Sequence, residues 1–207
     1  MKKKWVPALL IIGSLTVSIA LLQVGCASKA ESAAPVTEKK ELSKAALIER
    51  GRYLTTIGGC NDCHSPKKFG PHGPSLDSAR LLSGHPADAP LPPAELKALQ
   101  PGNWLAMAGD ATVFIGPWGM SFAANLTSDS ATGIGAWSEE VFVKALRTGK
   151  HLGQEGGRPI APPMPWEGIG QMTDEDLKSV YTYLQALPAI SNRVSAPIPP
   201  NEVIKMK

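Results

Sequence analysis

The stretch IGGCNDCHSP, residues 57–66, contains two cysteines and a histidine spaced as Cys60-x-x-Cys63-His64. Such a group can contribute to a metal site, form a disulfide or attach a prosthetic group. A structural zinc site needs four protein ligands, and the chain has no second pair of cysteines or histidines at matching spacing. A disulfide leaves His64 without a role. A thioredoxin-like pair follows a strand, whereas the residues before Cys60 have a helical pattern.

The same spacing is the attachment signature of a c-type haem. Two thiols three residues apart lie on one side of a helical turn, so they can add to two vinyl groups of one porphyrin. His64 is then carried beneath the ring, where its imidazole can coordinate the iron. Because the motif occurs once, we expect one covalent haem c, with thioether bonds at Cys60 and Cys63 and His64 as an axial ligand.

The second axial ligand must come from another part of the chain. The candidates are Met107, Met120, Met164, Met172, His72, His85 and His151. Met164 lies in the stretch PPMPW, where Pro162, Pro163 and Pro165 restrict the backbone and can hold the thioether in place. A thioether suits haem iron and raises its potential. We predict Met164 as this ligand; the alternative is a histidine, first of all His151, which would give a lower potential.

Two further residues are expected near the haem. Trp166, two residues after Met164, is predicted to pack on the porphyrin, although aromatic side chains more often belong to the core. Arg158 precedes the loop that contains Met164 and is predicted to pair with a haem propionate. Exposure of Arg158 to solvent is the alternative.

Three segments have the pattern of amphipathic helices with caps, at residues 43–59, 138–149 and 173–187. Residues 65–136 are instead rich in proline and glycine and show no strand-type alternation; a short helix is predicted over Pro93–Leu99. A loop of this length is unusual in a compact domain unless it wraps a ligand. We therefore expect an all-α domain of helices and long loops around one haem.

The N-terminus has the three parts of a bacterial export signal. Lys2–Lys4 precede the apolar run Val6–Leu22, and small residues surround Cys26. The Gly-Cys pair predicts lipid attachment to Cys26; the alternative is cleavage after Ala27 or Ala30, which would discard this cysteine. A permanent transmembrane anchor is a further alternative, but polar residues interrupt the apolar run and no basic stop-transfer cluster follows it.

The expected organisation is a signal peptide at 1–25, a flexible tether at 26–42, a cytochrome domain at 43–190 and an extended tail at 191–207. The chain of 207 residues carries a net charge of +3, and the first 25 residues contain three lysines and no acidic residue. The remainder is therefore neutral, which gives no support to nucleic-acid binding.

Three stretches carry a family resemblance: RGRYLTTIGGCNDCHSP, AANLTSDSATGIGAWSEEVFVKALRTGKH and PPMPWEGIGQMTDEDLKSVYTYLQALP. Together they cover much of residues 50–188. The chain resembles class I c-type cytochromes, specifically bacterial monohaem electron carriers and the cytochrome subunits of membrane-bound alcohol, aldehyde and gluconate dehydrogenases. The resemblance implies a class I cytochrome c-like helical domain with long loops around one haem. It also implies thioethers at Cys60 and Cys63, proximal His64 and distal Met164. Those subunits usually carry three such domains, whereas this chain has one motif.

These observations predict an exported electron carrier without catalytic activity of its own. It would lie on the periplasmic side of a bacterial membrane, held by the lipid on Cys26, or else be soluble in the periplasm. Its partners would be a dehydrogenase as electron donor and an oxidase or another cytochrome as acceptor, with no nucleic acid. Two alternatives are a cytochrome subunit within a dehydrogenase complex and a haem sensor or catalyst with an open sixth position.

Overall fold

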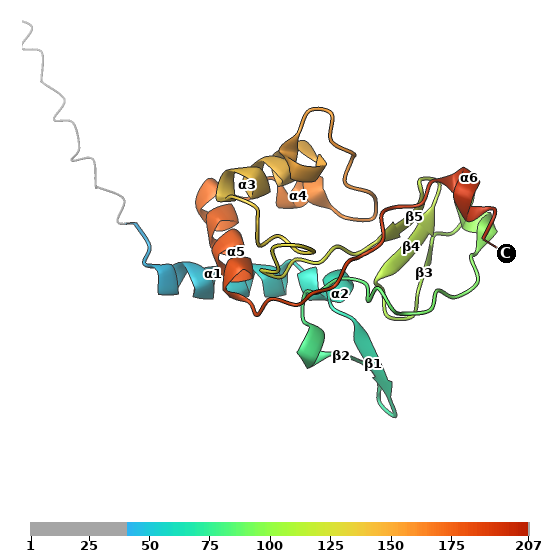
Figure 1. Cartoon of the computed structure of the whole chain (residues 1–207), viewed down its shortest axis with the longest axis horizontal. Coiled ribbons are helices and arrows are strands. Elements are labelled where there is room, and N and C mark those ends of the chain that lie inside the picture. The colour runs from blue at the N-terminus through green and yellow to red at the C-terminus, as the bar shows by residue number, and fades with distance from the viewer. Residues whose placement is uncertain (1–40, 207) are drawn as a thin grey trace, which may run out of the picture. The chain divides into compact units, whose positions relative to one another are not determined.

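The computed structural model describes residues 41–206 of the chain (Figure 1). The expected signal peptide, the lipidation of Cys26 and most of the expected tether lie outside these residues. Within the described range, no helix combines the length and the apolar character needed to cross a membrane.

The described residues form helices and two small antiparallel sheets. The α-helices are α1 (Lys44–Ile57), α2 (Cys60–His64), α3 (Glu139–Thr148), α4 (Trp166–Ile169), α5 (Asp174–Ala186) and α6 (Pro200–Val203). The strands are β1 (Lys67–Gly70), β2 (Gly73–Leu76), β3 (Ala106–Met107), β4 (Val113–Gly116) and β5 (Gly119–Phe122). Short 3-10 helices are η1 (Ser78–Arg80), η2 (Leu96–Leu99) and η3 (His151–Gly153).

The three long helices begin at the caps that the sequence predicts. The side chains of Ser43, Ser138 and Thr173 accept hydrogen bonds from backbone N–H groups in the first turns of α1, α3 and α5. Each cap satisfies a donor that the helix itself cannot pair. Acidic residues fill the first turns of α3 and α5, where the helix dipole favours negative charge.

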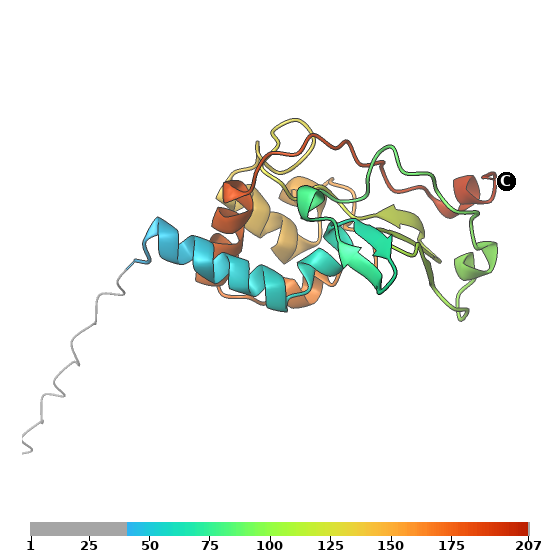
Figure 2. The same cartoon turned by 90° about the horizontal axis from the view of Figure 1, so that it is seen from below.

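Helices α1 and α5 cross in direct contact, as Figures 1 and 2 show from two directions. The crossing point is Gly51, where a Cβ would lie 2.0 Å from the carbonyl oxygen of Ser179 and 2.6 Å from Cβ of Tyr183. Only a residue without a side chain permits this approach. The crossing closes one hydrophobic core, the helical cluster, which consists of Leu54, Leu82, Ile134, Phe142, Leu146, Leu177, Val180 and Leu184.

The prediction of an all-α domain is wrong. Only 36% of the described residues are helical, and two sheets lie between α2 and α3. Strand β1 pairs with β2, and the second sheet has the order β3-β4-β5. These strands have two to four residues each, so alternation over a longer window cannot appear in the sequence.

The expected helix at Pro93–Leu99 is shorter than predicted. Only η2 forms, from Leu96 to Leu99, and the Glu95 side chain accepts a hydrogen bond from the backbone N–H of Lys97 at 3.1 Å. The prolines before Glu95 therefore lie outside the helix rather than in its first turn.

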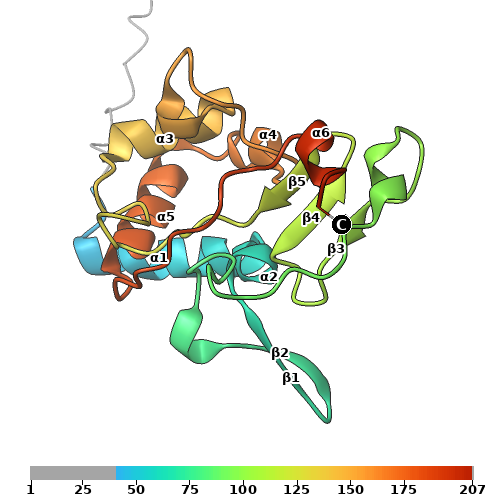
Figure 3. The same ribbon diagram turned by 45° about the vertical axis from the view of Figure 1, so that its right-hand side comes forward.

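Strands β3–β5 and the C-terminal segment share a second hydrophobic core. This sheet cluster consists of Ala98, Val113, Ile115, Met120 and Val203. Residues 191–199 are mostly extended, and Ile198 pairs with Met120 through reciprocal backbone hydrogen bonds of 2.8 and 2.9 Å. Helix α6 then places Val203, which is fully buried, against the strands (Figure 3). Much of the segment expected to wrap a ligand therefore folds around a core of its own.

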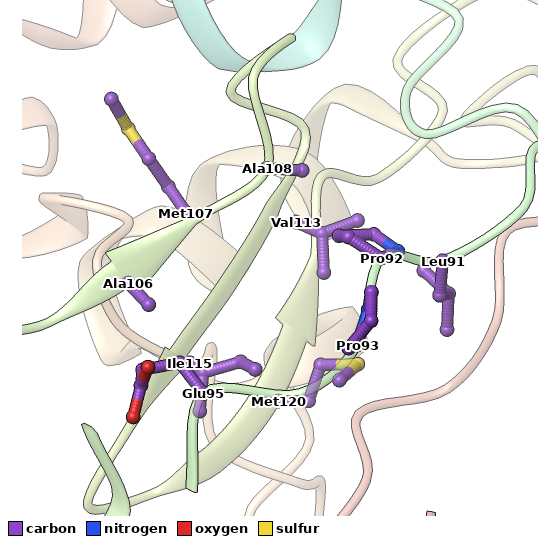
Figure 4. Close-up of a pocket in the computed structure, with 10 residues that line it drawn as sticks. All are labelled: Leu91, Pro92, Pro93, Glu95, Ala106, Met107, Ala108, Val113, Ile115 and Met120. Atoms are coloured by element: carbon purple, nitrogen blue, oxygen red, sulfur yellow. The ribbon is translucent and has the colours of Figure 1, made fainter. Parts of the chain in front are cut away.

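A cavity of about 170 Å³ lies beside the second sheet. It is lined by Leu91, Pro92, Pro93, Glu95, Ala106, Met107, Ala108, Val113, Ile115 and Met120 (Figure 4). In this view the Val113 side chain lies beside Pro92, whereas the Met107 side chain extends away from the other labelled residues. None of the predicted haem-binding residues lines this cavity.

Candidate functional site

The two cysteines lie on the single turn of helix α2. Cys60 and Cys63 are both free thiols, partly buried, and Cys60 packs against the helical cluster. Burial raises the pKa of both thiols above the ordinary value, so both carry their protons at neutral pH. The turn therefore presents two unpaired S–H groups three residues apart, as a pair of thioether attachments requires.

His64 ends helix α2 and is buried, with 8% of its surface exposed. Its Nδ1 lies 2.7 Å from the carbonyl oxygen of Ala124. A carbonyl only accepts, so Nδ1 carries a proton and donates it. Burial lowers the pKa of His64, which favours the neutral ring. The lone pair of Nε2 is thereby left for a metal, the arrangement in which a second hydrogen bond orients a histidine ligand.

Met164 lies in the loop between η3 and α4 and packs, partly buried, against the same helical cluster as Cys60. The loop is fixed from two sides. The hydroxyl of Ser121 in β5 donates to the carbonyl of Pro162 at 2.6 Å, and the N–H of Trp166 donates to the carbonyl of Met164 at 2.9 Å. The second sheet thus supports the loop that contains Met164, which we call the methionine loop. The sequence analysis predicted no strands and therefore did not predict this support.

The other candidate methionines differ in burial and in the hydrophobic cluster that they contact. Met120 is buried in the sheet cluster at 2% exposure, and Met107 is exposed at 67%. Met172 packs partly buried against the helical cluster, as Met164 does. Two methionines therefore share a core with Cys60, and of these only Met164 is flanked by prolines.

The candidate histidines are placed differently from one another. His72 is exposed in the turn between β1 and β2. His85 is buried, and its Nδ1 lies 2.8 Å from the hydroxyl of Thr112. The His151 ring packs edge-on against Trp137, with 5.6 Å between the ring centroids.

Trp166 and Arg158, which were predicted to lie near the haem, flank the loop that contains Met164. The indole of Trp166 lies against Gly149 at the end of α3, so close that a Cβ on this glycine would lie 2.4 Å from the ring. One part of this ring is therefore used to dock α4 on α3. Arg158 is exposed, and no ion pair joins it to a carboxylate within residues 41–206.

The donor set fits a covalent haem better than the alternatives. Across the described part of the chain, no group of three or more His, Cys, Asp or Glu side chains could hold a metal ion, so the zinc alternative lacks ligands. The free thiols Cys60 and Cys63 and the tautomer of His64 suit thioether attachment and axial coordination. The apolar residues of the helical cluster next to Cys60 and Met164 suit a porphyrin.

No protein-family model matches the chain. It is 30% identical over 138 residues to the gluconate 2-dehydrogenase cytochrome c subunit of Pantoea cypripedii, an alignment covering 67% of this chain and 22% of the relative. It is 29% identical over 150 residues to the cytochrome c subunit of alcohol dehydrogenase (quinone) of Gluconobacter oxydans, covering 69% and 24%. The fructose dehydrogenase cytochrome subunit of Gluconobacter japonicus is 27% identical over 137 residues, covering 66% and 20%.

The chain thus spans about a fifth of the length of these relatives. The similarity and the geometry of α2 agree with each other. The chain is a c-type cytochrome similar to the cytochrome c subunits of gluconate, alcohol and fructose dehydrogenases.

Proposed function

We propose that the protein carries single electrons through one haem c, bound covalently by Cys60 and Cys63 and coordinated by His64 and Met164. The proposal rests on the free thiols of helix α2 and on the hydrogen bond made by the histidine at its end. Its two thiols are unpaired, and the imidazole that follows them donates Nδ1–H to Ala124 at 2.7 Å, which leaves Nε2 for iron. When bound, the haem supplies an iron that alternates between ferric and ferrous states.

The chain's own residues attach and position this group. The S–H of Cys60 and of Cys63 would each add across a vinyl double bond of the haem, so no atom would leave on attachment. His64 is kept neutral by burial and oriented by the Ala124 carbonyl. The Met164 loop is held by Ser121 and Trp166. With His64 and Met164 both holding the iron, a bound haem would have no open position for a substrate, so we propose an electron carrier rather than an enzyme.

The relatives guide the choice of partner. Their names assign them to dehydrogenases for gluconate, alcohol and fructose. We propose that a dehydrogenase donates electrons to this chain, either as a separate partner or within one complex, and that an oxidase or another cytochrome accepts them. The export pattern and Cys26 support a place on the periplasmic side of a bacterial membrane, with a lipid anchor.

An optical experiment tests the haem and its ligands. The purified protein in alkaline pyridine should give a c-type haemochrome that survives extraction with acidified acetone. The reduced wild-type protein should not bind carbon monoxide, because both axial positions are filled. Loss of the chromophore on extraction would refute covalent attachment. Rapid carbon monoxide binding would refute the two-ligand assignment and favour a sensor or catalyst.

Co-purification tests the partner. From the native membrane, the tagged chain should be recovered with a larger catalytic chain that reduces it when the dehydrogenase substrate is added. Reduction of the cytochrome only by unrelated donors, with no catalytic chain recovered, would contradict the dehydrogenase partnership while leaving the haem assignment intact.

A further inference from the structure

The backbone around His64 is held by a short segment, residues 83–85, that lies far from the cysteine motif in the sequence. The N–H of Gly84 donates to the carbonyl of His64 at 2.8 Å. The N–H of His85 donates to the carbonyl of Ala123 at 2.9 Å, next to the Ala124 carbonyl that binds Nδ1 of His64. This segment, which we name the proximal clamp, therefore contacts both the ligand and the backbone that orients it.

Gly84 brings the proximal clamp unusually close to Ala124. Its φ is +77°, and a Cβ here would lie 2.5 Å from the carbonyl oxygen of Ala123 and 2.7 Å from that of Ala124. The position requires glycine because of both the left-handed backbone and the contact. Because the clamp lies against the backbone of Ala123 and Ala124, we expect a displacement of the clamp to shift the carbonyl that accepts the His64 proton.

Asn192 holds the proximal clamp from the C-terminal segment. Its Nδ2 donates to the carbonyl of Ser83 at 2.7 Å and to that of His85 at 2.8 Å, and its Oδ1 accepts from the N–H of Ala87 at 2.9 Å. Ser83 and His85 are buried, at 1% and 6% exposure. One amide thus satisfies three backbone groups on both sides of Gly84, where loss of the donors would leave buried carbonyls unpaired.

The backbone of Asn192 is itself fixed to the loop that follows Ala124. Its N–H donates to the hydroxyl of Thr132 at 2.9 Å, and the amide of Asn125 donates to the carbonyl of Ile190 at 2.8 Å. Asn192 therefore lies between the proximal clamp and the segment that carries the Ala124 carbonyl, and ties the two together.

We propose that Asn192 is a positioning residue for His64, acting through the proximal clamp to set the strength of the bond from His64 Nδ1 to Ala124. This inference rests on the proposed role of His64 as an iron ligand. A donor bond at the second nitrogen makes a ligating imidazole more basic, which favours the ferric state. Loosening the clamp should therefore favour the ferrous state.

The test compares reduction midpoints and ferric electron paramagnetic resonance spectra of the full-length holoprotein. Asn192→Ala removes all three side-chain bonds and should raise the ferrous-to-ferric ratio at a fixed ambient potential about threefold or more. Asn192→Ser retains one hydroxyl donor and should give a smaller rise, with a smaller change in the g values.

Asn201→Ala is the matched control, because Asn201 is an exposed amide of the same C-terminal segment whose side chain bonds only to its neighbour Glu202. Its midpoint and spectrum should equal those of the wild type. If Asn192→Ala does not accumulate as holoprotein, the midpoint and spectrum of Asn192→Ser test the inference instead. A lowered melting temperature with an unchanged midpoint in the Asn192 variants would overturn the inference. Absence of covalent haem in the wild type would instead refute the proposed function.

Discussion

Met164 and Met172 are the two candidate methionines that pack against the helical cluster beside Cys60. They differ in how the backbone around them is held. Met164 has prolines on both sides, and its loop accepts a hydrogen bond from Ser121 in the second sheet. Met172 follows α4 by three residues, and its N–H donates to Ile169 at 3.1 Å, a local turn without support from the sheet. A ligand that must stay bound in two iron oxidation states is better held by the supported loop of Met164 than by the local turn of Met172.

Replacing each methionine by alanine separates ligand from packing residue. In ferric Met164→Ala, the weak far-red absorption band of a methionine-ligated haem should vanish, and the midpoint potential should fall, because a thioether ligand raises it. Ferric Met172→Ala, the matched control, should keep the band and lose only packing, about 2 kcal/mol of unfolding free energy. A far-red band that survives in Met164→Ala and disappears in Met172→Ala would reverse the assignment.

The crossing of α1 and α5 is the main contact between elements, and Gly51 determines how close the two axes come. No side chain fits between this residue and the carbonyl of Ser179. Helix α1 also delivers the chain directly into α2, so the position of the cysteines depends on where α1 lies against the helical cluster.

Gly51→Val should therefore push the two helices apart. We expect the free energy of unfolding to fall by about 3 kcal/mol, the upper end of the range for overpacked cores. Gly168→Ala is the control, because Gly168 is also helical but a Cβ there meets no atom within 4 Å. Its stability should be unchanged or higher by up to about 1 kcal/mol. Chemical denaturation measures both, and equal stability of Gly51→Val and the wild type would contradict the described crossing.

The sequence predicted the elements whose signals are local and repeated. Helices α1, α3 and α5 each combine a side-chain cap with an apolar stripe over several turns, and both features are visible in the sequence. Strands β4 and β5 were missed because each has four residues and is buried along nearly its whole length, so no polar face alternates with an apolar one. The aromatic and β-branched residues on both sides of GPWG were the available signal for this hairpin.

The sequence indicates the side chains of the candidate site but not the backbone groups that hold them. Cys60, Cys63 and His64 form a motif whose chemistry depends on spacing alone. The Ala124 carbonyl that orients His64 has no sequence signature, since every residue carries such a group. Asn192 was read as part of a tail, because a contact across more than a hundred residues to Ser83 cannot be inferred from local pattern.

At the scale of the whole described chain, two hydrophobic cores are connected by the C-terminal segment. This segment leaves α5 in the helical cluster, holds the proximal clamp through Asn192, pairs with β5 at Met120, and ends with Val203 in the sheet cluster. The segment from 191 onward is therefore a structural part of the fold.

Val203→Ala tests this role. It removes two buried methyl groups from the sheet cluster and should lower the free energy of unfolding by about 2 kcal/mol. The neighbouring Ile204 is 51% exposed, so Ile204→Ala should change stability by no more than about 0.5 kcal/mol. Thermal unfolding followed by circular dichroism distinguishes the two variants. Equal melting temperatures would mean that α6 does not stabilise the sheet.

The proposed electron transfer depends on the covalent attachment of one haem to Cys60 and Cys63. The most direct measurement is the intact mass of the denatured, unreduced protein from a host that exports it and matures c-type cytochromes. Because thiol addition to a vinyl group releases no atom, we expect the mass of the processed chain plus one haem, and loss of that increment when both cysteines are replaced by alanine. A mass two hydrogens below that of the bare chain, indicating a disulfide between Cys60 and Cys63, would contradict it.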